Sequence, residues 1–272
     1  MCKILCSTGA LLGKANNRDY RLLKEIAPQL TCDGYEFMMY GSWYDEVDEI
    51  IKTLQETGIK IPVVHCEKHI GESISMGGEE NFREAYHLFE INCQIANKLG
   101  AKKIVMHLWD GLTSDANFEN NIEAYAIVNE MSKRYGLDLL VENVVCNKKS
   151  PMEHWCELAA IYPDIHFVFD TKMAAFHEQL DLLYDKEYEW LYKGGHICHY
   201  HVNDYAGGYK DWKNLRTLPI GKGHIDFERF FAHVRACGYE GTFTVESTVL
   251  MADGTIDIEM LNQQFEYIRE RV

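Results

Sequence analysis

The chain alternates a short apolar segment with a helical pattern eight times along its 272 residues. The apolar segments are bounded by turn residues, as buried strands are, and we expect strands at residues 3–9, 34–40, 61–67, 102–109, 137–143, 165–171, 195–204 and 241–247. Strands that alternate with helices lie parallel in one sheet. The pattern therefore predicts an α/β fold, a single (β/α)8 TIM barrel over residues 1–272, and leaves a doubly wound open sheet as the alternative.

The helical segments carry recognisable end signals. We expect helices at residues 17–30, 44–58, 79–100, 117–136, 150–162, 176–192, 226–238 and 256–271. Four of them end at a glycine, the residue preferred just beyond a helix C-terminus: Gly58, Gly100, Gly136 and Gly238. Ser150 suits the N-cap of the fifth helix, and Pro151 suits its first turn. Residues 68–78 are expected to form a glycine-rich loop.

Composition disfavours several classes of protein. The formal net charge of −15 opposes binding to a phosphate backbone, so we do not expect nucleic acid as a partner. No run of about 18 apolar residues is present, and residues 1–14 lack the form of a secretory signal, so we expect no membrane span and a cytoplasmic location. The nine cysteines are odd in number and form no Cys-x-x-Cys pair, which indicates reduced thiols.

Six polar side chains lie where the last six expected strands end. In a barrel the C-terminal ends of the strands meet at one mouth, which carries the chemistry. The six residues, from strands three to eight, are His65, His107, Glu142, Asp170, His201 and Glu246. Each alone is more often a helix cap or a hydrogen-bonded core residue. Together, with no lysine or arginine ending these strands, they would repel one another, and we therefore expect them to hold a divalent cation.

The segment HYHVND, residues 199–204, supports this interpretation. Side chains alternate along a strand, so His199, His201 and Asn203 share one face. We expect His201 to be a metal ligand and His199, one layer deeper, to be a core group or the support of a ligand. Oxygen and imidazole donors suit one Mn²⁺, Mg²⁺, Co²⁺ or Zn²⁺ ion, and the absence of thiolate argues against a closed structural zinc site. His65 and His107 leave a second metal site open.

Seven motifs resemble a known family. They are VVHCE, VMHLW, LLVENV, VFDT, HYHVND, LPIGKGHIDF and TVES, and they span most of the chain. Together they are similar to the xylose isomerase-like TIM barrels, which include sugar epimerases and isomerases, inosose dehydratase and endonuclease IV. The resemblance implies one divalent metal held by Glu142, Asp170, His201 and Glu246.

Members of the endonuclease IV type add two strand-end histidines, which His65 and His107 match, and a third metal. The histidine of that third metal, three residues after the strand-six aspartate, is replaced here by Met173, and the Asp-x-His before the GKG segment has no counterpart. Many sugar-acting members carry the same histidine, so Met173 also departs from their pattern. His177, seven residues after Asp170, is the candidate to reach the site instead, with a helix surface as the alternative.

The resemblance implies a metal-dependent isomerase or epimerase of a sugar, sugar phosphate or polyol. The metal would chelate a carbonyl and a neighbouring hydroxyl of the substrate and stabilise an enediolate. Glu142 and Glu246 would be the acid/base pair that removes and returns the proton. Return to the other face gives epimerisation and return to the neighbouring carbon gives isomerisation, and the sequence leaves both open.

Further loop residues suit contacts with substrate. Arg216 and Lys222 suit a phosphate or carboxylate, and Glu36 suits either a hydrogen bond to substrate or a structural role. Three tryptophans that follow strands suit stacking on a sugar, with packing at the barrel rim as the alternative: Trp43, Trp109 and Trp212. The GKG segment lacks the serine or threonine of a P-loop, which disfavours nucleotide binding.

Three other functions stay open. An endonuclease IV-like phosphoesterase is favoured by the His65–His107 pair, which with Glu142 suits a second metal. An inosose dehydratase-like lyase and a non-catalytic ligand-binding barrel are the others. We expect a small-molecule sugar or polyol as the partner. Four aromatic residues of the sixth helix form either a homo-oligomer interface or a packing surface against the barrel: Tyr184, Tyr188, Trp190 and Tyr192.

Overall fold

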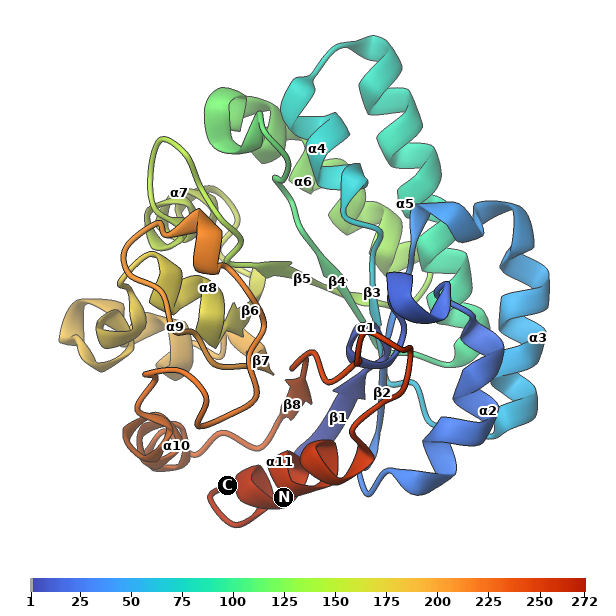
Figure 1. Ribbon diagram of the computed structural model, residues 1–272. Helices are drawn as coiled ribbons and strands as arrows, with labels where there is room; N and C mark the ends of the chain where they lie inside the picture. The colour runs from blue at the N-terminus through green and yellow to red at the C-terminus, as the bar shows by residue number, and fades with distance from the viewer. Residues whose placement is uncertain (1) are drawn as a thin grey trace.

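The strands close into a parallel barrel. In the computed structural model, which describes residues 2–272, the eight strands are hydrogen-bonded in chain order, and the helices form a ring around them (Figure 1). The strands are β1 Lys3–Ser7, β2 Gly34–Met38, β3 Val63–His65, β4 Lys103–Met106, β5 Asp138–Glu142, β6 His166–Asp170, β7 Ile197–Val202 and β8 Thr242–Val245. Because β1 also pairs with β8, the predicted (β/α)8 barrel is confirmed and the open-sheet alternative is wrong.

Helices and single turns connect the strands. The α-helices are α1 Thr8–Leu11, α2 Leu23–Ile26, α3 Val47–Thr57, α4 His69–Met76, α5 Glu79–Leu99, α6 Phe118–Arg134, α7 Pro151–Ile161, α8 Thr171–Phe176, α9 Trp190–Lys193, α10 Phe227–Ala236 and α11 Ile258–Arg269. The 3₁₀ turns are η1 Lys14–Asn16, η2 Tyr20–Leu22, η3 Ala27–Gln29, η4 Gly41–Glu46, η5 Ser114–Asn117, η6 Leu180–Tyr184, η7 Lys186–Tyr188 and η8 Trp212–Asn214.

The strand period places apolar and polar side chains in layers inside the barrel. One buried layer consists of Leu5, Val63, Val105, Leu140 and Val168. The residues two positions further along three of these strands are His65, Glu142 and Asp170. Since residues i and i+2 share a face, the same pattern that fills the barrel with apolar groups lifts polar groups to its mouth. A larger apolar layer, which includes Phe37, Trp155 and Phe243, lies outside and buries the helices against the barrel.

The segment after β3 is helical, which corrects the expected glycine-rich loop at residues 68–78. Ile70 and Ile74 of α4 are fully buried, so this short helix packs on the barrel. A Cβ atom on Gly71 would lie 2.1 Å from the carbonyl oxygen of His107. The glycine thus permits close contact between α4 and the end of β4, rather than marking a flexible turn.

Two expected helices are interrupted. The helix expected at residues 17–30 is divided into η2, α2 and η3. The helix expected at residues 176–192 is divided into the end of α8, η6, η7 and most of α9. The second break has a local cause, because Asp185 is extended (φ −80°, ψ 137°) and its side chain accepts a hydrogen bond from the amide of Glu187.

The aromatic residues of this interrupted segment pack onto the barrel side. The rings of Tyr184 and Tyr192 lie 5.0 and 4.9 Å from that of His233 on α10, and Trp190 lies 5.1 Å from His196. All are partly buried against the main core, as is Tyr188. A homo-oligomer interface at these residues stays a prediction.

Two other sequence signals, the cap at Ser150 and the free cysteines, are confirmed. Ser150 caps α7: its side chain accepts a hydrogen bond from the amide of Glu153, and its own amide donates one to the Glu153 carboxylate, which forms a capping box. All nine cysteines are free thiols.

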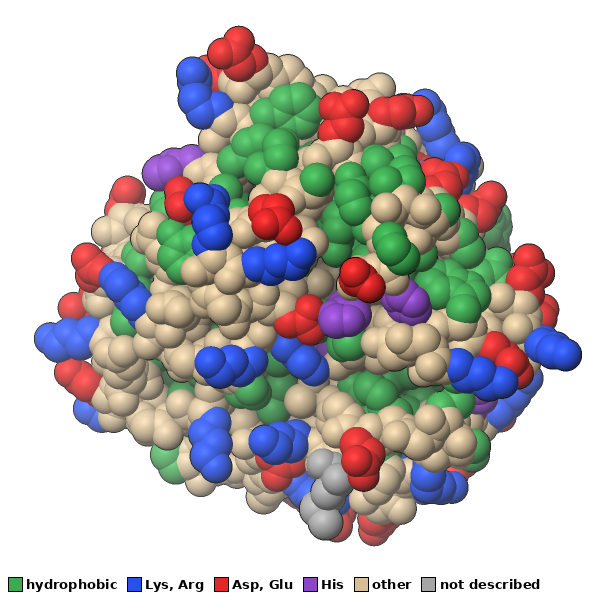
Figure 2. Space-filling view, turned by 180° about the vertical axis from the view of Figure 1, so that it is seen from behind, with side chains coloured by type: hydrophobic (Ala, Val, Ile, Leu, Met, Phe, Trp, Pro, Cys, Tyr) green, Lys and Arg blue, Asp and Glu red, His purple; other side chains and the backbone are tan. Residues whose placement is uncertain are grey.

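Within residues 2–272, each helix is too short or too polar to cross a membrane. Figure 2 shows Lys and Arg side chains scattered among Asp and Glu side chains over one face of the molecule.

Candidate metal centre

Four side chains from consecutive strands meet at the mouth of the barrel. Glu142 ends β5, Asp170 ends β6, His201 lies near the end of β7, and Glu246 directly follows β8. Each offers a donor atom within 4.8 Å of the donor atoms of the other three, and all but the partly buried Glu246 are buried. The structure therefore brings together the four residues that the strand pattern singled out.

His201 presents an unpartnered nitrogen to this group. Its Nε2 lies 3.0 Å from Oε1 of Glu36, whereas its Nδ1 lies 3.5 Å from Glu142 and 3.6 Å from Glu246. Among the described residues, Nδ1 is buried without a hydrogen-bond partner. A buried polar atom of this kind is costly unless a ligand satisfies it, so the donor set fits a metal ion bound through Nδ1.

The shifted pKa values of His201 and Asp170 also favour a bound cation at this site. Although burial opposes it, the carboxylates of Glu246, Glu36 and Glu142 raise the pKa of His201 well above its usual range. Burial also raises the pKa of Asp170 to about 6. The shift of His201 reflects the negative charge around it, and that of Asp170 reflects mainly its burial; a divalent cation would neutralise these buried carboxylates.

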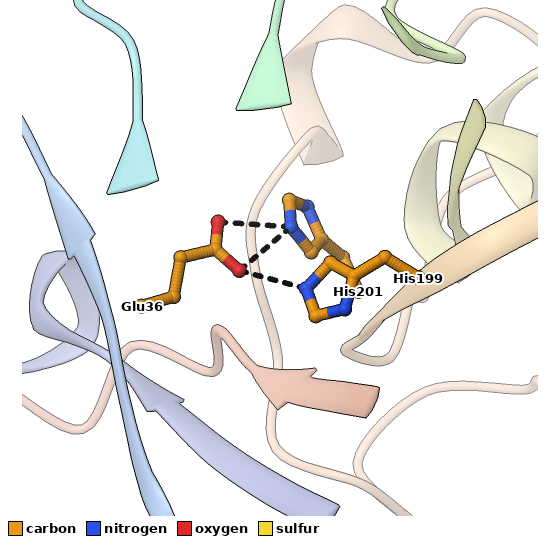
Figure 3. A group of neighbouring side chains, drawn as sticks. All are labelled: Glu36, His199 and His201. Carbon is orange, nitrogen blue, oxygen red and sulfur yellow. Dashed lines mark hydrogen bonds and ion pairs between the residues drawn. The ribbon is translucent and has the colours of Figure 1, made fainter. Parts of the chain in front are cut away.

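Glu36 of β2 holds the two histidines of β7 from across the barrel (Figure 3). Its Oε2 lies 2.8 Å from Nε2 of His199 and accepts a hydrogen bond from the hydroxyl of Thr244 at 2.7 Å. His199 also lies beside Thr242, with both side chains inside the barrel. Although burial opposes it, the imidazoles hold the pKa of Glu36 well below its usual range. Glu36 is fully buried and does not line the cavity described below, so the structure favours the structural alternative, and a contact with substrate stays a prediction.

Asp170 is held by neighbours that the sequence reading did not assign to the site. Its Oδ1 accepts a hydrogen bond from the amide of Met173 at 2.7 Å, which caps α8. Its Oδ2 accepts a hydrogen bond from the side chain of Asn203 at 3.2 Å. The backbone amide of Asp170 donates a hydrogen bond to Oδ1 of Asn143 at 2.6 Å. Asn203 shares a strand face with His201, and that spacing was the signal available in the sequence.

A second donor group adjoins the first through Glu142. The Nε2 atoms of His65 and His107 lie 3.2 and 3.1 Å from Oε2 of Glu142. Asp110 lies 2.5 Å from Nδ1 of His107, and together with Glu142 it raises the pKa of His107 to about 9, although burial opposes it. Glu142 thus faces two clusters of donors, one with His201 and one with the histidine pair.

A cavity of about 580 Å³ opens beside Glu246. Residues at the ends of β1 and β2 and in the segments after β1, β2, β3, β6, β7 and β8 line it, among them Arg18, Lys68 and Lys172. None of the three is among the site residues predicted from the sequence, because each lies beyond the last residue of a strand. Lys172 lies two residues after Asp170 and Lys68 three after His65, so both lie beyond the strand ends, where the sequence has no lysine or arginine.

The predicted substrate-binding residues lie outside this cavity. Trp109 is fully buried against Phe118, with ring centroids 5.4 Å apart. His177 is buried, and its Nε2 accepts a hydrogen bond from the amide of Cys146 at 3.1 Å. Burial lowers the pKa of His177 to about 4, so it is a neutral structural acceptor here. Arg216 and Lys222 are exposed on the loop after β7.

The GKG loop is positioned by Asp204. The carboxylate accepts hydrogen bonds from the amides of Gly221, Gly223 and Ile225 at 2.9, 2.8 and 3.1 Å. These amides are therefore engaged within the protein, which agrees with the expectation that the segment is not a P-loop.

Of the other two tryptophans expected near the site, Trp43 is buried beside Tyr20, and Trp212 is 54% exposed.

Comparison with known proteins identifies the family of the chain. The profile of the family described as xylose isomerase-like TIM barrel matches residues 25–269. An L-ribulose-5-phosphate 3-epimerase, UlaE, of Escherichia coli is 23% identical over 223 residues, which are 72% of this chain and 68% of the relative. D-allulose 3-epimerase from a Methylomonas species, solved with D-allulose, shares the fold with a TM-score of 0.73 at 15% identity, over 100% of this chain and 97% of that one. The IolI protein, solved with a bound zinc atom, aligns with a TM-score of 0.69 at 16% identity, over 99% of each chain. The family match covers most of the chain, and the protein belongs to the xylose isomerase-like TIM-barrel family.

Proposed function

We propose that the protein is a divalent-metal-dependent sugar epimerase or isomerase. The observation that carries the proposal is the convergence of Glu142, Asp170, His201 and Glu246, with Nδ1 of His201 buried among them without a hydrogen bond. These four residues would hold one Mn²⁺, Mg²⁺, Co²⁺ or Zn²⁺ ion. When bound, the ion supplies a Lewis acid that polarises a substrate carbonyl and makes the adjacent C–H more acidic.

Glu246 is the residue that we propose moves the proton. It lines the cavity and is partly exposed to it, so its carboxylate reaches a carbon atom next to the substrate carbonyl. Glu142 lies on the buried side of the same donor group, 3.5 Å from Nδ1 of His201. The two glutamates thus form the proposed acid/base pair, one removing the proton and the other, or the same one, returning it.

The names of the relatives support a sugar substrate. UlaE acts on L-ribulose 5-phosphate, and the structural neighbours include D-allulose 3-epimerase and an L-ribulose 3-epimerase. These proteins are 15–23% identical to this chain, so the particular sugar is part of the proposal and not of the comparison.

Solvent deuterium exchange tests the proposed reaction. The protein, loaded with Mn²⁺ in heavy water, is incubated with L-ribulose, L-ribulose 5-phosphate and D-allulose, and the carbon-bound protons are followed by NMR. Exchange at the carbon next to the carbonyl, with formation of the epimer or the isomer, is expected in the parent and not in Glu246→Gln. Lys222→Gln, which changes an exposed residue outside the cavity, should exchange like the parent.

The position of the deuterium separates the reactions. Label at C3 with inversion indicates a 3-epimerase, and label at C1 or C2 with an aldose product indicates an isomerase. Loss of a hydroxyl as water would instead support the dehydratase alternative. If the metal-loaded parent exchanged no proton of any of the three sugars, and Glu246→Gln behaved identically, the proposed acid/base pair would be wrong for these substrates.

A metal-dependent phosphoesterase is the second candidate, and the histidine pair favours it. His65, His107 and Glu142 offer donor atoms within 4.8 Å of one another, so a second metal would share Glu142 with the first. The apolar Met173 stands where the family's third-metal histidine is expected, and its side chain is buried. Two zinc ions per chain together with cleavage of DNA at abasic sites would favour this candidate over the epimerase.

A further inference from the structure

The cavity beside Glu246 is the size of a small-molecule site. Its volume of about 580 Å³ falls within the range of roughly 300–1,000 Å³ that is usual for such sites. Hydroxyl side chains line part of it, including Thr217 and Thr248, whose Oγ1 atoms lie 2.6 Å apart. Three cationic side chains line the rest: Arg18, Lys68 and Lys172.

Lys172 is a buried cation without a direct ion pair, although its charge acts on nearby Asp170 and opposes the rise in the pKa of that carboxyl. It is only 8% exposed, and none of the described residues pairs with its ammonium group by a hydrogen bond or an ion pair. Lysine is seldom buried so far unless an anion accompanies it. The ammonium lines the cavity, so the missing anion has room to bind there.

Arg18 lies in a different loop and is also unsatisfied. Its guanidinium lies 4.4 Å over the ring of Tyr40, and its Nε is buried without a hydrogen-bond partner within the described chain. The backbone of Arg18 adopts φ 52°, a left-handed conformation that residues other than glycine seldom take. Stacking on the ring fixes the planar group while leaving its N–H donors free for a bidentate anion.

The protein does not supply that anion from the cavity wall. Besides Glu246, Glu67 is the carboxylate among the lining residues, and it already lies 2.5 Å from Nδ1 of His69. Lys68, the exposed third cation, forms no direct ion pair within residues 2–272, although the carboxylates of Glu246, Glu142 and Asp110 raise its pKa against the effect of burial. In a chain with a formal net charge of −15, three cations around one cavity without a direct ion pair are not expected from the surface as a whole.

We propose that the cavity takes an anionic sugar, whose phosphate or carboxylate is held by Lys172 and Arg18, with Lys68 at the rim. This inference rests on the proposed function and names its substrate class. Lys172 lies in the first turn of α8, directly after β6, and Arg18 lies in the loop after β1, so the anion binds between elements that are far apart in sequence. The other end of the sugar then faces Glu246, and the anion fixes which carbon lies beside that carboxylate.

Binding of unreactive pentitols tests the proposal without turnover. Ribitol and ribitol 5-phosphate lack a carbonyl, so calorimetry with Mn²⁺-loaded protein measures their affinity alone. Ribitol 5-phosphate is expected to bind at least about tenfold more tightly than ribitol, since charge-assisted hydrogen bonds are the strong ones. Lys172→Gln and Arg18→Gln should each weaken the binding of ribitol 5-phosphate more than the binding of ribitol, and so remove most of this preference. Lys222→Gln, the matched exposed lysine outside the cavity, should keep it.

A second probe separates the two anions. If ribonate, which carries a carboxylate, shows the preference and ribitol 5-phosphate does not, the substrate class is a sugar acid; the reverse result indicates a sugar phosphate. Both results support the anion site, provided that the preference falls in Lys172→Gln and Arg18→Gln.

Two results would overturn the inference. One is equal affinity for ribitol, its phosphate and ribonate in the parent. The other is loss of bound metal from Lys172→Gln with the anion preference intact, because the lysine would then serve only to balance the charge of Asp170. Neither result depends on whether the protein exchanges substrate protons, so failure of this proposal is distinct from failure of the proposed reaction.

Discussion

Glu36 on β2 and His201 on β7 meet across the barrel, with Oε1 of Glu36 3.0 Å from Nε2 of His201. A proton on Nε2 donates to Glu36 and leaves the lone pair of Nδ1 facing Glu142 and Glu246. The carboxylate therefore selects both the tautomer and the orientation of the ring. Support of a metal-binding histidine by a carboxylate of this kind is common in metal sites.

Glu36→Gln is expected to weaken the affinity for Mn²⁺ by about tenfold, because the support of His201 loses its charge. Competition with a fluorescent chelator measures the dissociation constant directly. Thr244→Val is the matched control, since Thr244 donates to the same carboxylate at 2.7 Å but leaves the Glu36–His201 contact in place. Equal metal affinity in the parent and Glu36→Gln would show that the ring is oriented without this contact.

Asp115 should contribute stability that depends on pH. Its buried carboxylate accepts hydrogen bonds from the amides of Asn147, Lys148 and Lys149 and lies 3.0 Å from Nε2 of His154. Although burial opposes it, these partners lower the pKa of Asp115 from 3.8 to about 2. Since the folded-state value is the lower one, the contribution is present above about pH 4 and is lost as the pH falls through about 2.

Asp115→Asn is expected to lower the free energy of unfolding by about 1–2 kcal/mol at pH 7, after allowance for solvent screening. Urea unfolding of both proteins between pH 7 and pH 3 measures the difference, which should shrink toward acid. Asp48→Asn is the control, because the Asp48 side chain is 95% exposed and its ion pair with Lys98 is on the surface. A difference for Asp115→Asn that stays constant across this range would contradict the assigned pKa direction.

Gly71→Ala is expected to destabilise the protein by about 3 kcal/mol, because the new methyl group would lie 2.1 Å from the carbonyl oxygen of His107. Backbone cannot yield as a flexible side chain does, so α4 or the end of β4 must shift. Gly208→Ala serves as the comparison, since a Cβ atom there has no heavy atom of the described chain within 4 Å. Similar urea midpoints for the two variants would mean that α4 moves freely.

The fold follows from the sequence wherever periodicity is strong. Eight apolar segments separated by helical patterns specify a barrel, because each strand must be covered on both faces. The helix α4 escaped prediction because Gly71 lies in its interior, and a glycine that permits close packing has the same sequence signal as one that permits a turn. The break at Asp185 escaped because a local hydrogen bond outweighs helical spacing there.

The candidate metal ligands follow from strand parity, since residues two apart share a face and the last such residue reaches the mouth. Glu142, Asp170 and His201 are brought together on this ground alone. Lys172 and Arg18 could not be found in the same way, because a loop or the first turn of a helix has no fixed direction relative to the mouth. Trp109 illustrates the converse, since it follows a strand but turns into the core against Phe118.

Metal content tests the central claim most directly. The protein is purified without chelator, incubated with Mn²⁺ or Zn²⁺, desalted, and its metals are counted per chain by plasma mass spectrometry. Glu246→Gln is carried through the same steps, together with Lys222→Gln as a control for handling. Circular dichroism of each variant establishes that the fold is retained.

The account predicts about one divalent ion per chain in the parent and in Lys222→Gln, and a loss of about tenfold or more in Glu246→Gln. Two zinc ions per chain would add the His65–His107 site and favour the phosphoesterase. A parent that stays empty after incubation with both metals would contradict the claim that Glu142, Asp170, His201 and Glu246 form a metal centre.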